Sequence, residues 1–204
     1  MPFVRVRHRA SLLLLPLLFA CATGGTEVRA PQPTVLEVQP GDPVWPTPQP
    51  WSPKAMEFDV EHYALDLNLL VPTHEIQGRL SIDFLSVDSA TLKTIQLDCA
   101  ELQVQRVLGE RGGALRFEQA GDRLVVELAQ PLAFQDPASI TIEYRGKPRK
   151  GLYFVPTDPV HQVFTQGECE GARYWFPCQD RPDDRATSEL TVHMPAAWVS
   201  LAAG

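Results

Sequence analysis

The sequence predicts an all-β domain, an antiparallel sandwich or open barrel, over residues 55–204. Apolar residues alternate with polar ones in several short segments, such as 63–69 and 140–144, and this period of two is typical of strands with one buried face. Turn signals separate the segments, as at Gly121-Asp122. No long segment has helical periodicity, so we expect roughly ten short strands.

Residues 1–20 have the features of an export signal. Arg5, Arg7 and Arg9 precede an apolar run at 10–20 that is too short to span a bilayer. The run ends in Leu-Phe-Ala-Cys at Cys21, which resembles a bacterial lipobox. We therefore expect an exported lipoprotein that is anchored to a membrane through a lipid on Cys21. Because no Asp follows the Cys, we expect the outer membrane, with the protein facing the periplasm. The alternative is an ordinary secretory signal with an incidental Cys.

Residues 21–54 are predicted to be a disordered tether. This segment holds eight of the 19 prolines of the chain, and closely spaced prolines favour an extended, polyproline-like chain over regular hydrogen bonding. A lipid followed by such a linker would hold the next domain away from the membrane. The roles of Trp45 and Trp51 in this segment stay open.

The overall composition is that of a globular domain, with 44% hydrophobic and 21% charged residues. The formal net charge is −7 at pH 7. This charge argues against nucleic acid as a partner, because phosphate binding needs clustered Lys and Arg.

Three cysteines follow Cys21. We expect Cys99 and Cys178 to be buried thiols that pack as small hydrophobic side chains. Cys169 could pair with Cys178 in an oxidising compartment, although the spacing does not decide this. A less favoured possibility is a zinc site, for which the chain lacks the short Cys-x-x-Cys spacing. Its ligands would be Cys169, Cys178, His161 and His193.

The most informative segment, residues 163–195, reads VFTQGECEGARYWFPCQDRPDDRATSELTVHMP. It resembles the N-terminal domain of aminopeptidase N-like zinc metallopeptidases, the gluzincin aminopeptidase family. The matching residues are Thr165-Gln166-Gly167-Glu168, Ala172-Arg173, Phe176-Pro177-Cys178, Asp180, Pro182, Ala186-Thr187 and Thr191-Val192.

Weaker similarity extends this resemblance over about residues 59–204. It implies a saddle-like antiparallel β-sandwich beside a thermolysin-like catalytic domain. Further strands would follow in such a protein, so we expect this domain to be incomplete at its C-terminus and truncated before the catalytic domain.

Gln166 and Glu168 are the candidate substrate-binding residues. If residues 163–168 form a strand, these two side chains point to the same side. A carboxylate beside an amide oxygen suits a primary ammonium group, because both are acceptors and the charges are opposite. The resemblance implies that both contact the free α-amino group of a peptide substrate. The alternatives are a solvated strand edge, or a structural ion pair between Glu168 and Arg173.

The sequence offers no catalytic or metal-binding residues of its own. The family's His-Glu-x-x-His motif binds zinc on one face of a helix. Here His74 precedes Glu75, but no second His stands four residues on, and we interpret His74-Glu75 as a turn at the surface. The family's Gly-x-Met-Glu-Asn motif is also missing from these 204 residues. The charges of segment 180–185 are expected to lie in a solvated turn.

These observations predict the substrate-amine-recognising domain of a secreted zinc aminopeptidase that removes N-terminal residues from peptides. The chain as given is expected to be inactive alone and to hold no cofactor, with zinc expected in the full-length parent. Its expected partners are a peptide N-terminus, the missing catalytic domain and a membrane. The alternative is a non-catalytic lipoprotein β-sandwich that binds a protein or peptide partner.

Overall fold

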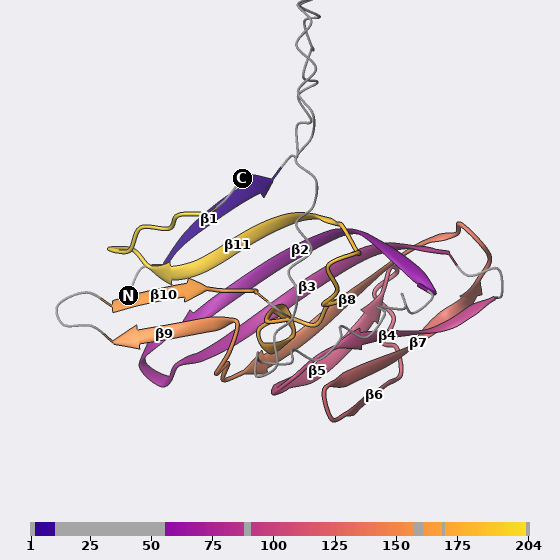
Figure 1. Ribbon diagram of the computed structural model, residues 1–204, viewed down its shortest axis with the longest axis horizontal. Helices are drawn as coiled ribbons and strands as arrows, with labels where there is room; N and C mark the ends of the chain where they lie inside the picture. The colour runs from indigo at the N-terminus through magenta and orange to yellow at the C-terminus, as the bar shows by residue number, and fades with distance from the viewer. Residues whose placement is uncertain (1–2, 11–55, 88–90, 157–160, 169, 203–204) are drawn as a thin grey trace, which may run out of the picture. The chain divides into compact units, whose positions relative to one another are not determined.

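The computed structural model describes residues 3–10, 56–87, 91–156, 161–168 and 170–202. The described residues form eleven strands and two short 3₁₀ helices, η1 (Val71–Thr73) and η2 (Ala172–Tyr174) (Figure 1). The all-β prediction is therefore confirmed. The strands are β1 (Phe3–Ala10), β2 (Phe58–Leu70), β3 (Glu75–Ser86), β4 (Leu92–Asp98), β5 (Leu102–Gly109), β6 (Phe117–Ala120), β7 (Arg123–Leu132), β8 (Pro137–Gly146), β9 (Leu152–Pro156), β10 (His161–Thr165) and β11 (Thr187–Pro195).

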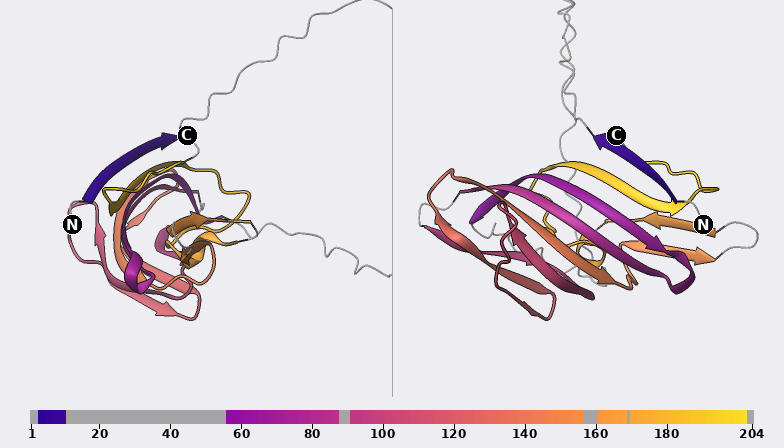
Figure 2. Two further views of the ribbon diagram at one scale, coloured as in Figure 1. Left: turned by 90° about the vertical axis from the view of Figure 1, so that its left-hand side faces the viewer. Right: turned by 180° about the vertical axis from the view of Figure 1, so that it is seen from behind.

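The strands are arranged in three sheets. The largest has the order β1-β11-β2-β3-β8-β5, and the others are β4-β7-β6 and the hairpin β9–β10. Figure 2 shows that the six-stranded sheet is curved, with the hairpin β9–β10 on its concave side. In this arrangement the start of β9 lies next to the part of the family-like motif that follows β10.

One strand pair departs from the expected antiparallel pattern. Strand β11 runs parallel to β2, with Leu190 opposite Leu65, whereas the other strand pairs are antiparallel. Parallel neighbours need a long crossover connection. The intervening sheets supply it here, since the paired residues His62 and Thr187 are 125 positions apart in the sequence.

The period-two alternation of the sequence places side chains as predicted. Leu65, Leu67 and Leu69 of β2 are buried, as are Ile140 and Ile142 of β8. Burial of each such aliphatic side chain contributes about 1.5–3 kcal/mol relative to leaving it exposed. The core between the sheets is therefore built from one face of each strand.

Tyr144 connects this core to the motif segment. Its ring lies over Gly78 of the neighbouring strand, where a β-carbon would overlap with the ring. The Tyr144 hydroxyl then donates a hydrogen bond of 2.8 Å to the carbonyl of Trp175. Trp175 and Phe176 pack against the core. The core thus fixes the position of helix η2 and the residues around it.

The predicted export signal is described only in part. Strand β1 pairs antiparallel with residues 188–195 of β11. Residues 11–20, the lipidation candidate Cys21 and the tether with Trp45 and Trp51 lie outside the described residues. No helix in the described part of the chain is long and apolar enough to cross a membrane.

Candidate functional site: the recess beside Glu168

The loop 166–171 carries both candidate binding residues. The strand expected over 163–168 is shorter in the structure, because β10 ends at Thr165. After it the chain turns back: the Gly171 N–H donates to the Gly167 carbonyl at 3.3 Å, and Glu170 adopts a positive φ of 63°. A turn residue in this left-handed region cannot continue a strand. Strand alternation therefore does not explain how Gln166 and Glu168 are placed.

The turn nevertheless brings the two side chains to one recess. Gln166 and Glu168 both line an open cavity of about 320 Å³, together with Lys150, Tyr174 and Glu170. Gln166 and Glu168 are exposed. Within the described part of the chain, the Glu168 side chain takes part in no hydrogen bond or ion pair. Its carboxylate is thus available to a ligand.

The expected alternative, an ion pair between Glu168 and Arg173, is not formed. Arg173 instead contacts Glu170 at 2.8 Å, Asp180 at 3.0 Å and Asp98 at 3.5 Å. Only 15% of the Arg173 side chain is exposed. Burial alone lowers the pKa of Arg173, but its hydrogen bond to Asp180 and the charge of Asp98 raise it overall. Arg173 is therefore a charged group held inside a ring of carboxylates.

Lys150 lines the same recess as Glu168. Its ammonium group lies 5.2 Å from the centre of the Tyr174 ring, within the range of a cation–π contact. Sequence reasoning missed Lys150 and Tyr174 as lining residues. No local pattern links them to Gln166, because they reach the recess from the β8–β9 loop and from η2.

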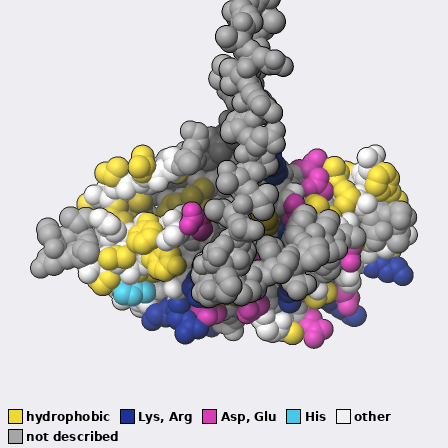
Figure 3. Space-filling view, in the orientation of Figure 1, with side chains coloured by type: hydrophobic (Ala, Val, Ile, Leu, Met, Phe, Trp, Pro, Cys, Tyr) yellow, Lys and Arg dark blue, Asp and Glu magenta, His cyan; other side chains and the backbone are white. Residues whose placement is uncertain are grey.

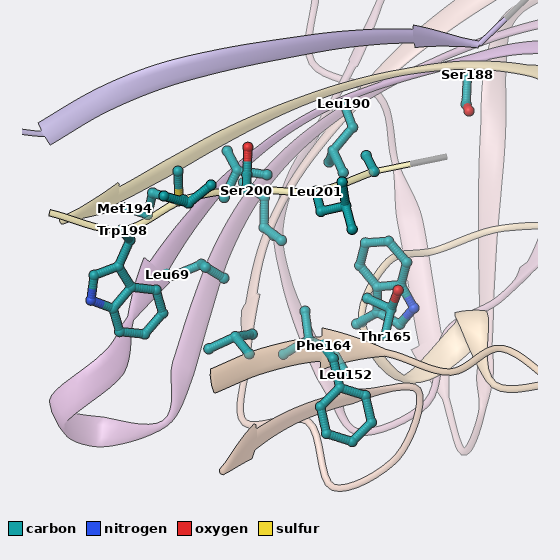
Figure 4. Close-up of a pocket in the computed structure, with 16 residues that line it drawn as sticks. Leu69, Leu152, Phe164, Thr165, Ser188, Leu190, Met194, Trp198, Ser200 and Leu201 are labelled. Atoms are coloured by element: carbon teal, nitrogen blue, oxygen red, sulfur yellow. The ribbon is translucent and has the colours of Figure 1, made fainter. Parts of the chain in front are cut away.

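A second, apolar cavity of about 470 Å³ lies between the hairpin β9–β10 and strands β2 and β11 (Figure 4). Phe164 and Leu201 line it and are 45% and 100% exposed. In Figure 3, hydrophobic side chains also gather over the hairpin on the face shown. A polar recess and an apolar cavity therefore both border the hairpin β9–β10.

A comparison with protein families shows to which family the chain belongs. Residues 59–204 match the family model of the peptidase M1 N-terminal domain. The chain belongs to this family. The predicted resemblance is thereby confirmed, and the fold matches the β-sandwich of M1 N-terminal domains.

Relatives of this M1 domain include both sequences and solved structures. It is 35% identical over 103 residues to the Tricorn protease-interacting factor F2 of Thermoplasma acidophilum, a match that covers 49% of this chain and 12% of that protein. The M1 zinc metallopeptidase of Deinococcus radiodurans aligns with a TM-score of 0.55 and 26% identity, over 66% of this chain and 32% of that chain. Native yeast LTA4 hydrolase aligns with a TM-score of 0.56 and 26% identity, over 65% and 22%. The chain thus spans a third or less of each relative.

Two cysteines of this M1 domain are buried thiols, as expected. Cys99 and Cys178 are both free and buried. Burial, with a smaller contribution from Asp122, raises the pKa of Cys99 to about 12. Burial also raises the pKa of Cys178 well above its usual value, so both thiols stay neutral. Cys169 lies outside the described residues, but Cys178 is a free thiol in this structure, so the possible disulfide between them is not formed here.

Two of the four conceivable zinc ligands, Cys169 and the side chain of His161, lie outside what the structure describes. The described residues of the M1 domain contain no group of three or more His, Cys, Asp and Glu side chains that could hold a metal. Of the conceivable ligands, His193 contacts Asp66 at 2.7 Å, and Cys178 pairs through its backbone with Asp98. His74 ends η1 in a left-handed conformation and lies in the expected turn, whereas Glu75 already begins strand β3.

The charges of segment 180–185 are less solvated than expected. The Asp180 carboxylate accepts a hydrogen bond from the Arg173 guanidinium. Both carboxylate oxygens of Asp184 are shielded from solvent, and no hydrogen bond of normal geometry reaches them from any described residue. The expectation of a fully solvated turn is therefore wrong at these two positions, because the segment folds back onto β2 and β4.

Replacing Asp184 with Asn is expected to remove a pH-dependent loss of stability. Burial, followed by the Asp59 charge, raises the pKa of Asp184 to about 6. The folded protein therefore holds this proton more tightly than the unfolded chain, whose Asp has a pKa of about 4. The resulting stabilisation is complete below about pH 4 and is lost as the pH rises through about 6.

Thermal unfolding of the wild type and the Asp184→Asn variant tests this. Because water screens a half-buried carboxyl, we expect the free energy of unfolding of the wild type to fall only about 1–2 kcal/mol below that of the variant as the pH rises. The Asn variant should be the more stable protein at about pH 7.5, with the difference vanishing near pH 4. A parallel pH dependence in the two proteins would contradict the assignment.

Proposed function

We propose that this domain binds the free amino end of a peptide for a zinc aminopeptidase of the M1 family. The observation that carries the proposal is the unpaired carboxylate of Glu168, which lines the same recess as the amide side chain of Gln166. A substrate ammonium group would find there one charged acceptor and one neutral acceptor. Acetylation of the amine removes the charge and should prevent binding.

The domain's own contribution is binding and orientation. Hydrolysis in this proposal belongs to a catalytic domain, which would supply the zinc that polarises the peptide carbonyl. The apolar cavity around Phe164 and Leu201 supports such a neighbour, since exposed apolar patches mark interaction surfaces. The names of the relatives, zinc metallopeptidases and aminopeptidases, support the same reaction class.

The complete gene product tests this function. We expect the reading frame beyond codon 204 to encode Gly-x-Met-Glu-Asn and His-Glu-x-x-His. The purified product should bind zinc and hydrolyse alanine anilide but not N-acetyl-alanine anilide, whereas the 204-residue chain should hydrolyse neither. A complete product that lacks both motifs, or that cleaves both anilides at similar rates, would contradict the proposal and favour a non-catalytic binding protein.

We propose in addition that the mature protein is anchored to a membrane through Cys21. The basic and apolar pattern before Cys21 supports this. The Cys21→Ser variant should move from the membrane fraction to the soluble fraction in cell fractionation, because a lipid anchor needs the thiol. Recovery of the wild type in the soluble fraction would show that the anchor is not formed.

A further inference from the structure

The start of β9 and the end of the loop 166–171 approach unusually closely. Gly151 has a φ of 72° and accepts a hydrogen bond of 2.9 Å from the Gln166 N–H. A β-carbon on Gly151 would overlap with the carbonyl group of Gly171. Only glycine combines this left-handed conformation with such close backbone contact.

Gly171 is constrained from the other side. It is buried, and a β-carbon there would lie 2.9 Å from the Gln166 carbonyl oxygen. Its N–H closes the turn onto Gly167 at 3.3 Å. The loop that carries Gln166 and Glu168 is thus fixed at both of its ends by backbone contacts to glycine.

The middle of the loop has a separate attachment. Glu170 bonds to the Arg173 guanidinium at 2.8 Å, and Arg173 in turn bonds to Asp180 at 3.0 Å. This ion pair engages Glu170 and leaves the Glu168 side chain without a partner among the described residues. The described residues on either side of Cys169 are therefore held in place before any ligand arrives, which lowers the entropic cost of binding.

We infer that Gly151 is a positioning residue for the amine site: its backbone contacts with Gln166 and Gly171 set where Gln166 and Glu168 lie in the recess. This inference rests on the proposed function of that recess. A side chain at position 151 would push the Gly171 carbonyl away and strain the hydrogen bond from Gln166. A displacement of about 1 Å in a site of this kind can cost about 100-fold.

The test compares two glycines with the same backbone strain. Gly151 and Gly112 have φ values of 72° and 77°, but a β-carbon on Gly112 would have no neighbour within 4 Å. We expect the positive φ to lower the thermal stability of both Gly→Ala variants of the 204-residue chain, and the overlap with Gly171 to lower that of Gly151→Ala further. Only Gly151→Ala should speed amide exchange at Gln166, by about tenfold or more, and weaken binding of L-alaninamide by about tenfold or more in an NMR titration.

A milder pair keeps the inference testable if Gly151→Ala fails to fold. Gly171→Ala introduces the 2.9 Å contact with Gln166 in a conformation open to alanine, whereas Gly113→Ala again meets no neighbour within 4 Å. We expect faster amide exchange at Gln166 and weaker binding of L-alaninamide for Gly171→Ala, and neither effect for Gly113→Ala.

The outcomes separate the inference from the proposed function. Unchanged Gln166 exchange in Gly151→Ala, or in Gly171→Ala if the first variant does not fold, overturns the positioning role. The same applies if Gly151→Ala and Gly112→Ala bind L-alaninamide equally. If the wild type binds no L-alaninamide, the proposed function fails, and the exchange rates still decide whether Gly151 holds the loop.

Discussion

Replacing Glu168 with Gln in the complete enzyme is expected to lower kcat/KM by roughly 30-fold or more on substrates with a free amino terminus. The variant keeps the shape of the side chain but removes the charge that faces the substrate ammonium. Glu168 is exposed in this domain, so the cost of about 2–5 kcal/mol for breaking a buried charge pair from one side applies to the enzyme in which the catalytic domain encloses the bound ammonium. A factor of ten in rate corresponds to about 1.4 kcal/mol. Steady-state kinetics on an aminoacyl anilide measures the loss.

Glu118→Gln is the matched control for this kinetic effect. Glu118 is an exposed carboxylate on strand β6, which belongs to a different sheet from the hairpin that leads to the recess. Its neutralisation should change stability by no more than about 0.5 kcal/mol and leave kcat/KM unchanged. Near-normal kcat/KM for Glu168→Gln would contradict a role for Glu168 in amine binding.

Replacing Arg173 with Met should destabilise the domain by about 3–5 kcal/mol, because removal of one partner leaves buried carboxylates uncompensated. Asp98 and Asp180, with side chains 9% and 11% exposed, would lose the guanidinium between them. The remaining contact from Arg123 to Asp98, at 2.8 Å, places the expected loss near the lower end of this range. Urea unfolding measures it as a lower midpoint with little change in slope.

Arg149→Met is the control for the Arg173 variant. Arg149 also pairs with a carboxylate, Glu101, but its side chain is 77% exposed. Exposed pairs contribute little to stability, so this variant should unfold close to the wild type. Equal urea midpoints for the two Arg→Met variants would show that the carboxylate ring around Arg173 is not a stabilising core element.

Much of the fold could be predicted from local sequence, because the side-chain period of a strand is a local property. The alternation at 63–69 correctly identified Leu65, Leu67 and Leu69 as buried residues of β2. The parallel pairing of β11 with β2 could not be predicted in this way, since its partners are far apart in the chain and hydrophobic alternation carries no information about strand direction. The bond from the Asp180 N–H to Asp98 and the effect of Asp59 on Asp184 also depend on segments distant in sequence.

The candidate site shows the same division between local and distant determinants. The motif identified Gln166 and Glu168, but strand alternation was the wrong reason for their common orientation, because β10 ends before both residues. Their placement depends on Gly151 and Gly171, which meet only in the folded chain. The family comparison shows an M1 N-terminal domain over 59–204, whereas the role of the recess is the proposal that experiments have to decide.

The most direct test of that proposal is an NMR titration of the 204-residue chain with L-alaninamide and with N-acetyl-L-alaninamide. We predict shift changes centred on Gln166 and Glu168 with the free amine, none with the acetylated compound, and loss of the response in Glu168→Gln. Equal responses to the two compounds, or a free-amine response that survives in Glu168→Gln, would contradict amine recognition by this recess.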